Sequence, residues 1–161
     1  MFSFIFYNFG IEISNKGHDH GYEKFSYNQI LSLIKLVKFL IKKYKINKKN
    51  ILGHSDISIE RKKDPGEKFP WPFLSKKGIG IWHNIDQTKL KKLRREKITV
   101  FERSKGIKLL KNIGYFNNKL NDKKHTKLIK SFQRRFRQEL VDGIMDLECL
   151  IIAEKLRKLY K

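Results

Sequence analysis

The chain has 161 residues, which is enough for one medium-sized domain or two small ones, and its 40% share of apolar residues excludes wholesale disorder. Its formal charge of +21 suits a polyanionic partner such as nucleic acid, an anionic membrane surface or an acidic wall polymer. Lysine in excess with one alanine, Ala153, is also what an AT-rich genome would encode, so the charge names no partner by itself. The single cysteine, Cys149, excludes an intramolecular disulfide, and no apolar run approaches the ~20 residues of a membrane span.

The first half of the chain predicts an α/β layer. Residues 4–13 are rich in aromatic residues and isoleucine and alternate weakly, as a buried strand does. A helix is expected from Ser26, because Gln29 three residues later completes a capping-box pattern. Its broad apolar face should lie against a sheet, and Ile51-Leu52 should begin a second strand.

A loop rich in turn residues follows the second expected strand. It reads Gly53-His54-Ser55-Asp56-Ile57, then Arg61-Lys62-Lys63-Asp64-Pro65-Gly66, and closes on Phe69-Pro70-Trp71. The three prolines of the chain fall at positions 65, 70 and 72. A loop stiffened in this way can hold side chains in fixed positions.

The second half predicts helices. Residues 86–103 are highly charged and predict a linker or an exposed helix. Short helices are then expected at 106–113, ending at Gly114, at 126–137, and at 147–160 after Asp146 as its N-cap.

His54 and Asp64 stand out as candidates for chemistry. An imidazole and a carboxylate on one stiff loop are acceptable zinc ligands. The alternative is that His54 is a hydrogen-bonded structural residue, which is the commoner role of a loop histidine.

The loop resembles the signature of the zinc-dependent N-acetylmuramoyl-L-alanine amidases related to peptidoglycan recognition proteins (type-2 amidases). The resemblance implies that His54 and Asp64 bind Zn²⁺ and that Lys62 stabilises an oxyanion. Upstream, Gly10-Ile11-Glu12 resembles the strand segment of the family whose glutamate helps to activate the zinc-bound water, which places that role on Glu12. The turn from Gly17 to Tyr22 resembles the subgroup that carries a C-terminal wall-binding module.

The C-terminal segment is similar to the three-helix peptidoglycan-binding module. The matching positions include Ile113-Gly114-Tyr115, Ser131-Phe132-Gln133 and Asp142-Gly143, and Cys149 stands where the module usually has threonine. The resemblance therefore implies a mixed-sheet α/β amidase domain over residues 1–100, incomplete at its N-terminus, and a three-helix bundle over residues 104–161.

The family binds zinc with three protein ligands, and the first is a histidine on an early strand. Only eleven residues precede Glu12 and none is histidine, so the resemblance implies a chain that begins in mid-domain. His18 or His20 could substitute for that ligand. A degraded gene, a misplaced start codon or a frameshift would each explain the gap, and the last would make a separate N-terminal fragment a partner.

Three functions remain open on the sequence. The first is a zinc amidase that hydrolyses the bond between N-acetylmuramic acid and L-alanine, acting on peptidoglycan or on muropeptides during recycling. The second is an inactive remnant that only binds peptidoglycan through residues 104–161. The third is nucleic-acid binding through Lys89–Lys97, which is disfavoured because no recognised binding motif accompanies the charge run. We expect a cell-envelope or periplasmic location if an export signal lies upstream, and a cytoplasmic one otherwise.

Overall fold

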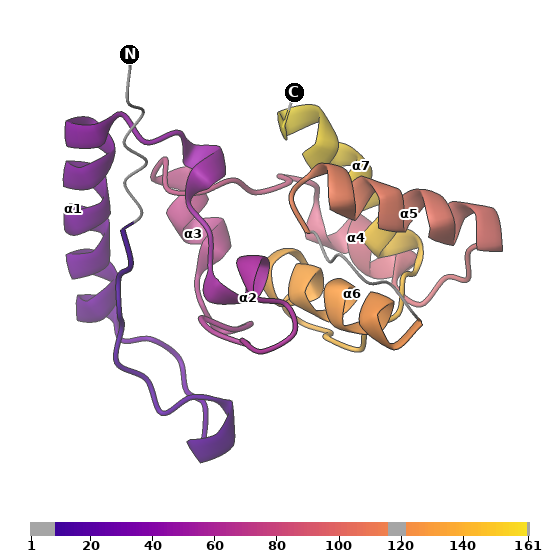
Figure 1. Cartoon of the computed structure of the whole chain (residues 1–161), viewed down its shortest axis with the longest axis horizontal. Coiled ribbons are helices and arrows are strands. Elements are labelled where there is room, and N and C mark those ends of the chain that lie inside the picture. Colours follow the sequence, from indigo (N-terminus) through magenta and orange to yellow (C-terminus); the bar gives the residue numbers. More distant parts are fainter. Residues whose placement is uncertain (1–8, 116–121, 161) are drawn as a thin grey trace, which may run out of the picture.

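The structure is a computed structural model that describes residues 9–115 and 122–160, and throughout these ranges the regular structure is helical (Figure 1). Short 3₁₀ turns lie at His18–His20 and Lys48–Asn50. The α-helices are α1 (Tyr27–Tyr44), α2 (His54–Ile57), α3 (Trp71–Lys76), α4 (Gln87–Leu93), α5 (Val100–Asn112), α6 (Asp122–Phe136) and α7 (Leu147–Tyr160).

The predicted mixed sheet is wrong: residues 9–115 and 122–160 contain no strand. Residues 9–13 are not helical, and Ile11 and Ile13 pack on the core while Glu12 is exposed, so the expected alternation is present. An extended segment becomes a strand only when a neighbour pairs with its N–H and C=O groups. Neither residues 9–13 nor residues 51–52 have such a ladder, and residues 4–8 of the first expected strand lie outside the described part.

Helix α1 begins where the sequence predicts. The Ser26 hydroxyl accepts from the Gln29 N–H at 3.3 Å, and the Gln29 side chain accepts from the Ser26 N–H at 2.8 Å. This reciprocal capping box satisfies two N–H groups that the first turn leaves without helical partners. The helix ends at Tyr44 and is capped by Lys45, which has a left-handed φ of 50° and donates its N–H to the Ile41 carbonyl.

The apolar face of α1 is covered along only part of its width. Ile30, Leu33 and Val37 are buried, but Leu36 and Phe39 are exposed. Figure 1 shows α1 at one edge of the molecule, away from the helices of the C-terminal half. The prediction that a sheet covers this broad face fails for the same reason as the sheet itself.

Residues 86–103, predicted as a linker or an exposed helix, contain α4 and the start of α5. The Asp86 carboxylate caps α4 by accepting from the Lys89 N–H at 2.9 Å. Leu90 is buried, and α4 packs against α7. Arg94, just beyond the helix, donates to Glu148 at 2.7 Å and to Glu139 at 2.9 Å. The segment is therefore folded onto the helical half.

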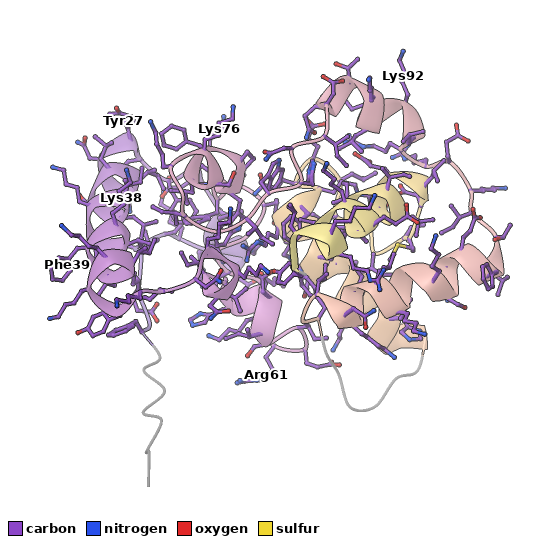
Figure 2. The ribbon with its side chains drawn as sticks, turned by 90° about the horizontal axis from the view of Figure 1, so that it is seen from above. Tyr27, Lys38, Phe39, Arg61, Lys76 and Lys92 are labelled. Carbon is purple, nitrogen blue, oxygen red and sulfur yellow. The ribbon has the colours of Figure 1, made fainter. Side chains whose placement is uncertain are left out.

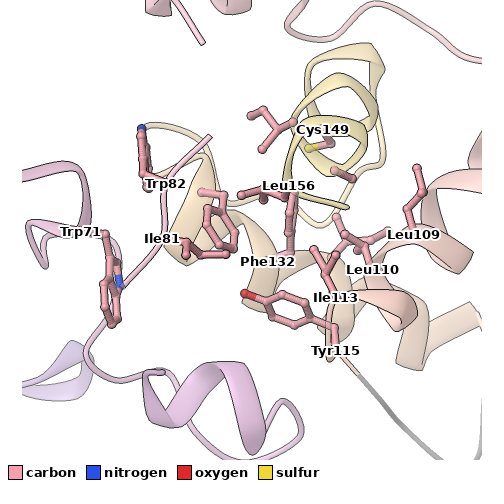
Figure 3. Packing of buried hydrophobic residues seen from close by; sticks show 14 of the residues in the cluster. Trp71, Ile81, Trp82, Leu109, Leu110, Ile113, Tyr115, Phe132, Cys149 and Leu156 are labelled. Carbon is pink, nitrogen blue, oxygen red and sulfur yellow. The ribbon is translucent and has the colours of Figure 1, made fainter. Parts of the chain in front are cut away.

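In the C-terminal half, helix α5 packs against α7 and also contacts α6 (Figure 3). Helix α5 starts earlier than expected, because Thr99 and Glu102 form a capping box at its N-terminus. Helix α7 begins as predicted, since the Asp146 carboxylate accepts from the Cys149 N–H at 3.0 Å. The core side chains that Figure 3 labels on these helices include Leu109, Leu110, Phe132, Cys149 and Leu156.

Gln133 holds the loop between α6 and α7. Its side-chain amide donates to Asp142 and to the Ile144 carbonyl, both at 2.9 Å, and accepts from the Gly143 N–H at 2.7 Å. Gly143 has a φ of +82°, and a Cβ there would lie 2.6 Å from the Thr126 methyl group, so glycine is required. Cys149 lies beside this amide in the core, and burial raises the pKa of its thiol to about 12.

Candidate functional site

The loop from Gly53 to Gly66 is closed by its own backbone. The Ser55 N–H donates to the Asp64 carbonyl at 2.8 Å, and the Gly53 N–H donates to the Asp56 carboxylate at 2.8 Å. A Cβ on Gly53 would lie 2.5 Å from Cδ of Pro65, so only glycine allows the two ends of the loop to approach this closely. These contacts fix the short helix α2 against the Asp64-Pro65 segment.

This closure brings His54 and Asp64 together. Nδ1 of His54 lies 2.5 Å from Oδ2 of Asp64, although ten residues separate them in the sequence. The side chains are 42% and 52% exposed, so the pair is open to solvent and to a ligand. The structure thus places the two predicted metal ligands side by side.

The donor chemistry of this pair fits zinc, but the number of donors is incomplete. A catalytic zinc site takes three protein ligands and a water. Across residues 9–115 and 122–160, no group of three His, Cys, Asp or Glu side chains is placed to hold a metal. His18, one of the two substitutes considered from the sequence, faces Glu67 at 3.0 Å and stacks on Tyr22.

The two predicted catalytic residues are both exposed and lie on different segments of the chain. Lys62 is exposed, and its backbone N–H donates to the Ser58 carbonyl at 2.9 Å within the same loop. Glu12 is also exposed, on the segment before the His18–His20 turn. Within the described residues, no hydrogen bond or ion pair joins Glu12 to His54, Lys62 or Asp64. Their roles therefore stay predictions.

The turn that precedes α1 is anchored on the loop. The Tyr22 hydroxyl donates to the Pro65 carbonyl at 2.6 Å and accepts from the Lys68 N–H at 2.8 Å. Burial raises the pKa of Tyr22 to about 12, so the hydroxyl keeps its proton for this contact. Gly66 has a φ of +81°, and a Cβ there would lie 2.6 Å from the Tyr22 oxygen. The turn and the loop are therefore tightly fitted beside the His54–Asp64 pair.

A buried polar network under α2 was not predicted from the sequence. Asp56, two residues after His54, accepts from Arg135 Nη1 and from the Tyr115 hydroxyl, both at 2.5 Å. Arg135 also donates to the Ile51 carbonyl at 3.0 Å and lies 4.1 Å above the Trp71 ring. The candidate site is thereby tied to helix α6 of the C-terminal half.

Electrostatics keep Arg135 charged within this network. Burial alone would lower the pKa of Arg135, but the adjacent Asp56 carboxylate outweighs it and the net shift is upward. Burial and the same carboxylate raise the pKa of Tyr115 well above its usual value. Asp56 lies within the recognised loop signature, yet no local signal indicates a partner 79 residues away.

Comparisons with known proteins agree with the loop signature. A model of the N-acetylmuramoyl-L-alanine amidase family matches residues 6–67. The N-acetylmuramoyl-L-alanine amidase AmiD of Escherichia coli is 33% identical over 157 residues, which cover 94% of this chain and 57% of AmiD. The 1,6-anhydro-N-acetylmuramyl-L-alanine amidase AmpD of Haemophilus influenzae is 42% identical over 65 residues, which cover 40% of this chain and 34% of AmpD.

Solved structures extend the similarity to three dimensions. The complex of Escherichia coli AmiD with anhydro-N-acetylmuramic acid-L-Ala-D-γ-Glu-L-Lys has a TM-score of 0.74 and 34% identity, and the match covers 86% of this chain and 55% of AmiD. AmpDh3 of Pseudomonas aeruginosa in complex with an anhydromuramic pentapeptide has a TM-score of 0.72 and 31% identity, with 86% of this chain and 55% of AmpDh3 covered.

This chain spans little more than half the length of AmiD. The His54–Asp64 loop, the family match over residues 6–67 and the similarity to AmiD along 94% of the chain point in one direction. In this loop and along most of its length, the chain is similar to the type-2 N-acetylmuramoyl-L-alanine amidases.

Proposed function

We propose that this chain acts in zinc-dependent hydrolysis of the amide bond between N-acetylmuramic acid and L-alanine. The observation that carries the proposal is the contact between His54 Nδ1 and Asp64 Oδ2, which places two donors of the right chemistry on the loop of the family signature. Two relatives are named as amidases of this bond type, which supports the same reaction.

Zinc, when bound, would lower the pKa of a coordinated water to ~7. In the proposed site His54 and Asp64 would hold the metal. Lys62, two residues before Asp64, would place its ammonium near the oxygen that gains negative charge when the carbonyl is attacked. Glu12 would accept a proton from the attacking water and pass it to the leaving amine.

The substrate class follows from the relatives. AmiD and AmpDh3 are each described in complex with an anhydromuramic acid linked to a peptide. We therefore propose a muropeptide, with one sugar and its stem peptide, as the substrate of this chain. Hydrolysis would release the sugar and a free peptide.

The proposal is tested with the 161-residue chain, a synthetic anhydro-N-acetylmuramic acid tripeptide and added zinc. Mass spectrometry would follow release of the tripeptide. We expect hydrolysis that is lost in His54→Ala and reduced about 10²–10³-fold in Lys62→Ala, the usual effect of removing one oxyanion donor. Lys108→Ala, an exposed change on α5, is the matched control and should keep full activity.

Metal binding is measured separately from activity. Zinc content after a zinc soak and desalting should fall in His54→Ala and in Asp64→Ala but not in His20→Ala. A wild-type chain that neither retains zinc nor cleaves the tripeptide, but still sediments with insoluble cell wall, would overturn the amidase proposal. The second candidate function is that of a peptidoglycan-binding protein without catalysis. It is favoured by the number of clustered metal donors, because the described residues bring two together where zinc needs three.

A further inference from the structure

A hollow of about 180 Å³ lies between the candidate-site loop and helix α6. Besides Ile59 and Glu60, its lining consists of positively charged side chains. The loop contributes Arg61, Lys62 and Lys63, and α6 contributes Lys127, Lys130 and Arg134. Figure 2 shows Arg61 extending outward at the rim of the molecule. Two segments far apart in the sequence therefore concentrate positive charge beside Asp64.

Most of this charge is unmatched. Lys127 pairs with Glu60 at 2.8 Å, and Lys63 lies 3.6 Å from Asp19. Among the described residues, no carboxylate lies within ion-pair distance of Lys62, Lys130 or Arg134. Like charges held around one small hollow repel one another, and an anion bound there would relieve that repulsion.

Arg134 is the most informative of these cations because it is half-buried. Burial lowers the pKa of Arg134. The negative charge of Glu67 acts in the opposite direction but is too weak to reverse this shift. A partly desolvated guanidinium without a direct anionic partner is unfavourable. Its forked donors match the two oxygens of a carboxylate.

We propose that this hollow binds a carboxylate of the substrate peptide, with Arg134 as the forked donor and with Lys130 beside it. The inference rests on the proposed function, because the peptide is the substrate of that reaction. Lys62 and Lys63, which line the hollow, directly precede Asp64 in the sequence, so a group held there would lie on the same loop as the proposed metal ligands. In the tripeptide bound by AmiD, the γ-linked glutamate keeps a free α-carboxylate, and the terminal lysine carries a second carboxylate.

The consequence concerns the predicted wall-binding module. Arg134 and Lys130 lie on α6, within residues 104–161, whereas Lys62 lies on the candidate-site loop. The module would then form one wall of the substrate site in addition to any role as an anchor. Specificity for charged over amidated stem peptides would depend on α6.

The test measures binding without hydrolysis. The ¹⁵N-labelled 161-residue chain, with metal removed by a chelator, is titrated with the free tripeptide L-Ala-D-γ-Glu-L-Lys and followed by chemical shifts. Two further peptides carry an amide at the glutamate α-carboxyl or at the C-terminus. We expect one of them to bind at least tenfold more weakly than the parent, and that peptide identifies the carboxylate in the hollow.

Variants then assign the contact. Arg134→Gln should weaken binding of the parent peptide at least tenfold and abolish the preference over the amidated peptide, while Arg134→Lys should keep part of both. Lys108→Gln on α5 removes one exposed charge elsewhere and should change neither. Thermal unfolding of each variant confirms that it is folded.

Two results would overturn the inference: equal affinity of the wild-type chain for all three peptides, or an unchanged affinity in a folded Arg134→Gln variant. Either result leaves hydrolysis by the His54–Asp64 site intact. Conversely, a carboxylate preference that depends on Arg134, without any hydrolysis, would reject the amidase reaction and keep this binding site.

Discussion

His83 shows how burial sets the charge of one residue. The ring is fully buried, and its Nδ1 accepts from the Ile85 N–H at 3.1 Å, so the neutral ring carries its proton on Nε2. Burial lowers the pKa of His83 to about 4, because the charged ring would lose its hydration. The sequence indicated no role for this histidine, and the structure assigns it a place in the core beside Trp82.

This predicts an acid-sensitive contribution to stability. Below pH ~6.5 the unfolded chain binds a proton at this position that the folded chain does not, so the contribution is complete above pH ~6.5 and is lost as the pH falls towards 4. We expect the free energy of unfolding to fall between pH 7.5 and 4 by ~3 kcal/mol more in the wild type than in His83→Gln. Urea unfolding at several pH values measures this difference, and parallel curves would contradict it.

The loop from Gly53 to Gly66 shows which site residues could be predicted from the sequence. His54, Lys62 and Asp64 were predicted from the family signature, and the contact between His54 and Asp64 agrees with a shared site. Asp56 lies in the same signature, but its role was missed because its partners, Tyr115 and Arg135, come from the other half of the chain.

At the scale of the element, α1 has a start that is set by neighbouring residues and a burial that is set by distant ones. Its start at Ser26 depends on hydrogen bonds that span three residues, and the sequence predicted it correctly. Its burial depends on what lies opposite. Leu33 is 8% exposed and Leu36 is 44% exposed, although both belong to the apolar face expected from the sequence.

These two leucines provide a matched pair for testing the face of α1. Leu33→Ala should lower the free energy of unfolding by about 2–5 kcal/mol, because it leaves a cavity in the core. Leu36→Ala should cost less than ~1 kcal/mol, since its side chain already contacts solvent. Urea unfolding followed by circular dichroism checks both. Equally large losses of unfolding free energy in the two variants would contradict the exposed position of Leu36.

At the scale of the whole molecule, the link between Asp56 and Arg135 joins the loop from Gly53 to Gly66 to the helical half. The two side chains are 5% and 1% exposed, so their charges are compensated by each other and not by water. The division at residues 100–104 stays a prediction, but this contact crosses it. Helix α2 accordingly packs on α6.

Removing one partner of this buried pair should be costly. Arg135→Leu leaves the Asp56 carboxylate without its cation, and we expect a loss of about 3–5 kcal/mol in the free energy of unfolding. Arg157→Leu, the same change at an exposed position on α7, should cost no more than ~0.5 kcal/mol. Guanidinium unfolding measures both, and adding Asp56→Asn to Arg135→Leu should recover part of the loss. Similar costs for the two leucine variants would contradict a stabilising link.

The sequence by itself determined the features that depend on near neighbours. These are the capping box at Ser26, the Asp146 cap of α7, the helical character of the C-terminal half without all of its helix bounds, and the loop that carries His54, Lys62 and Asp64. Each depends on hydrogen bonds or periodicity within a few residues, or on a fixed spacing within one loop.

Only the tertiary structure decided how the segments combine. The pattern of residues 4–13 indicates extended, half-buried chain, but a strand exists only if another segment supplies the facing backbone groups, and the described residues supply none. The number of metal donors that meet, the charged hollow between the loop and α6, and the Asp56–Arg135 pair likewise depend on residues far apart in the sequence. Such contacts are set by packing, and no local pattern encodes them.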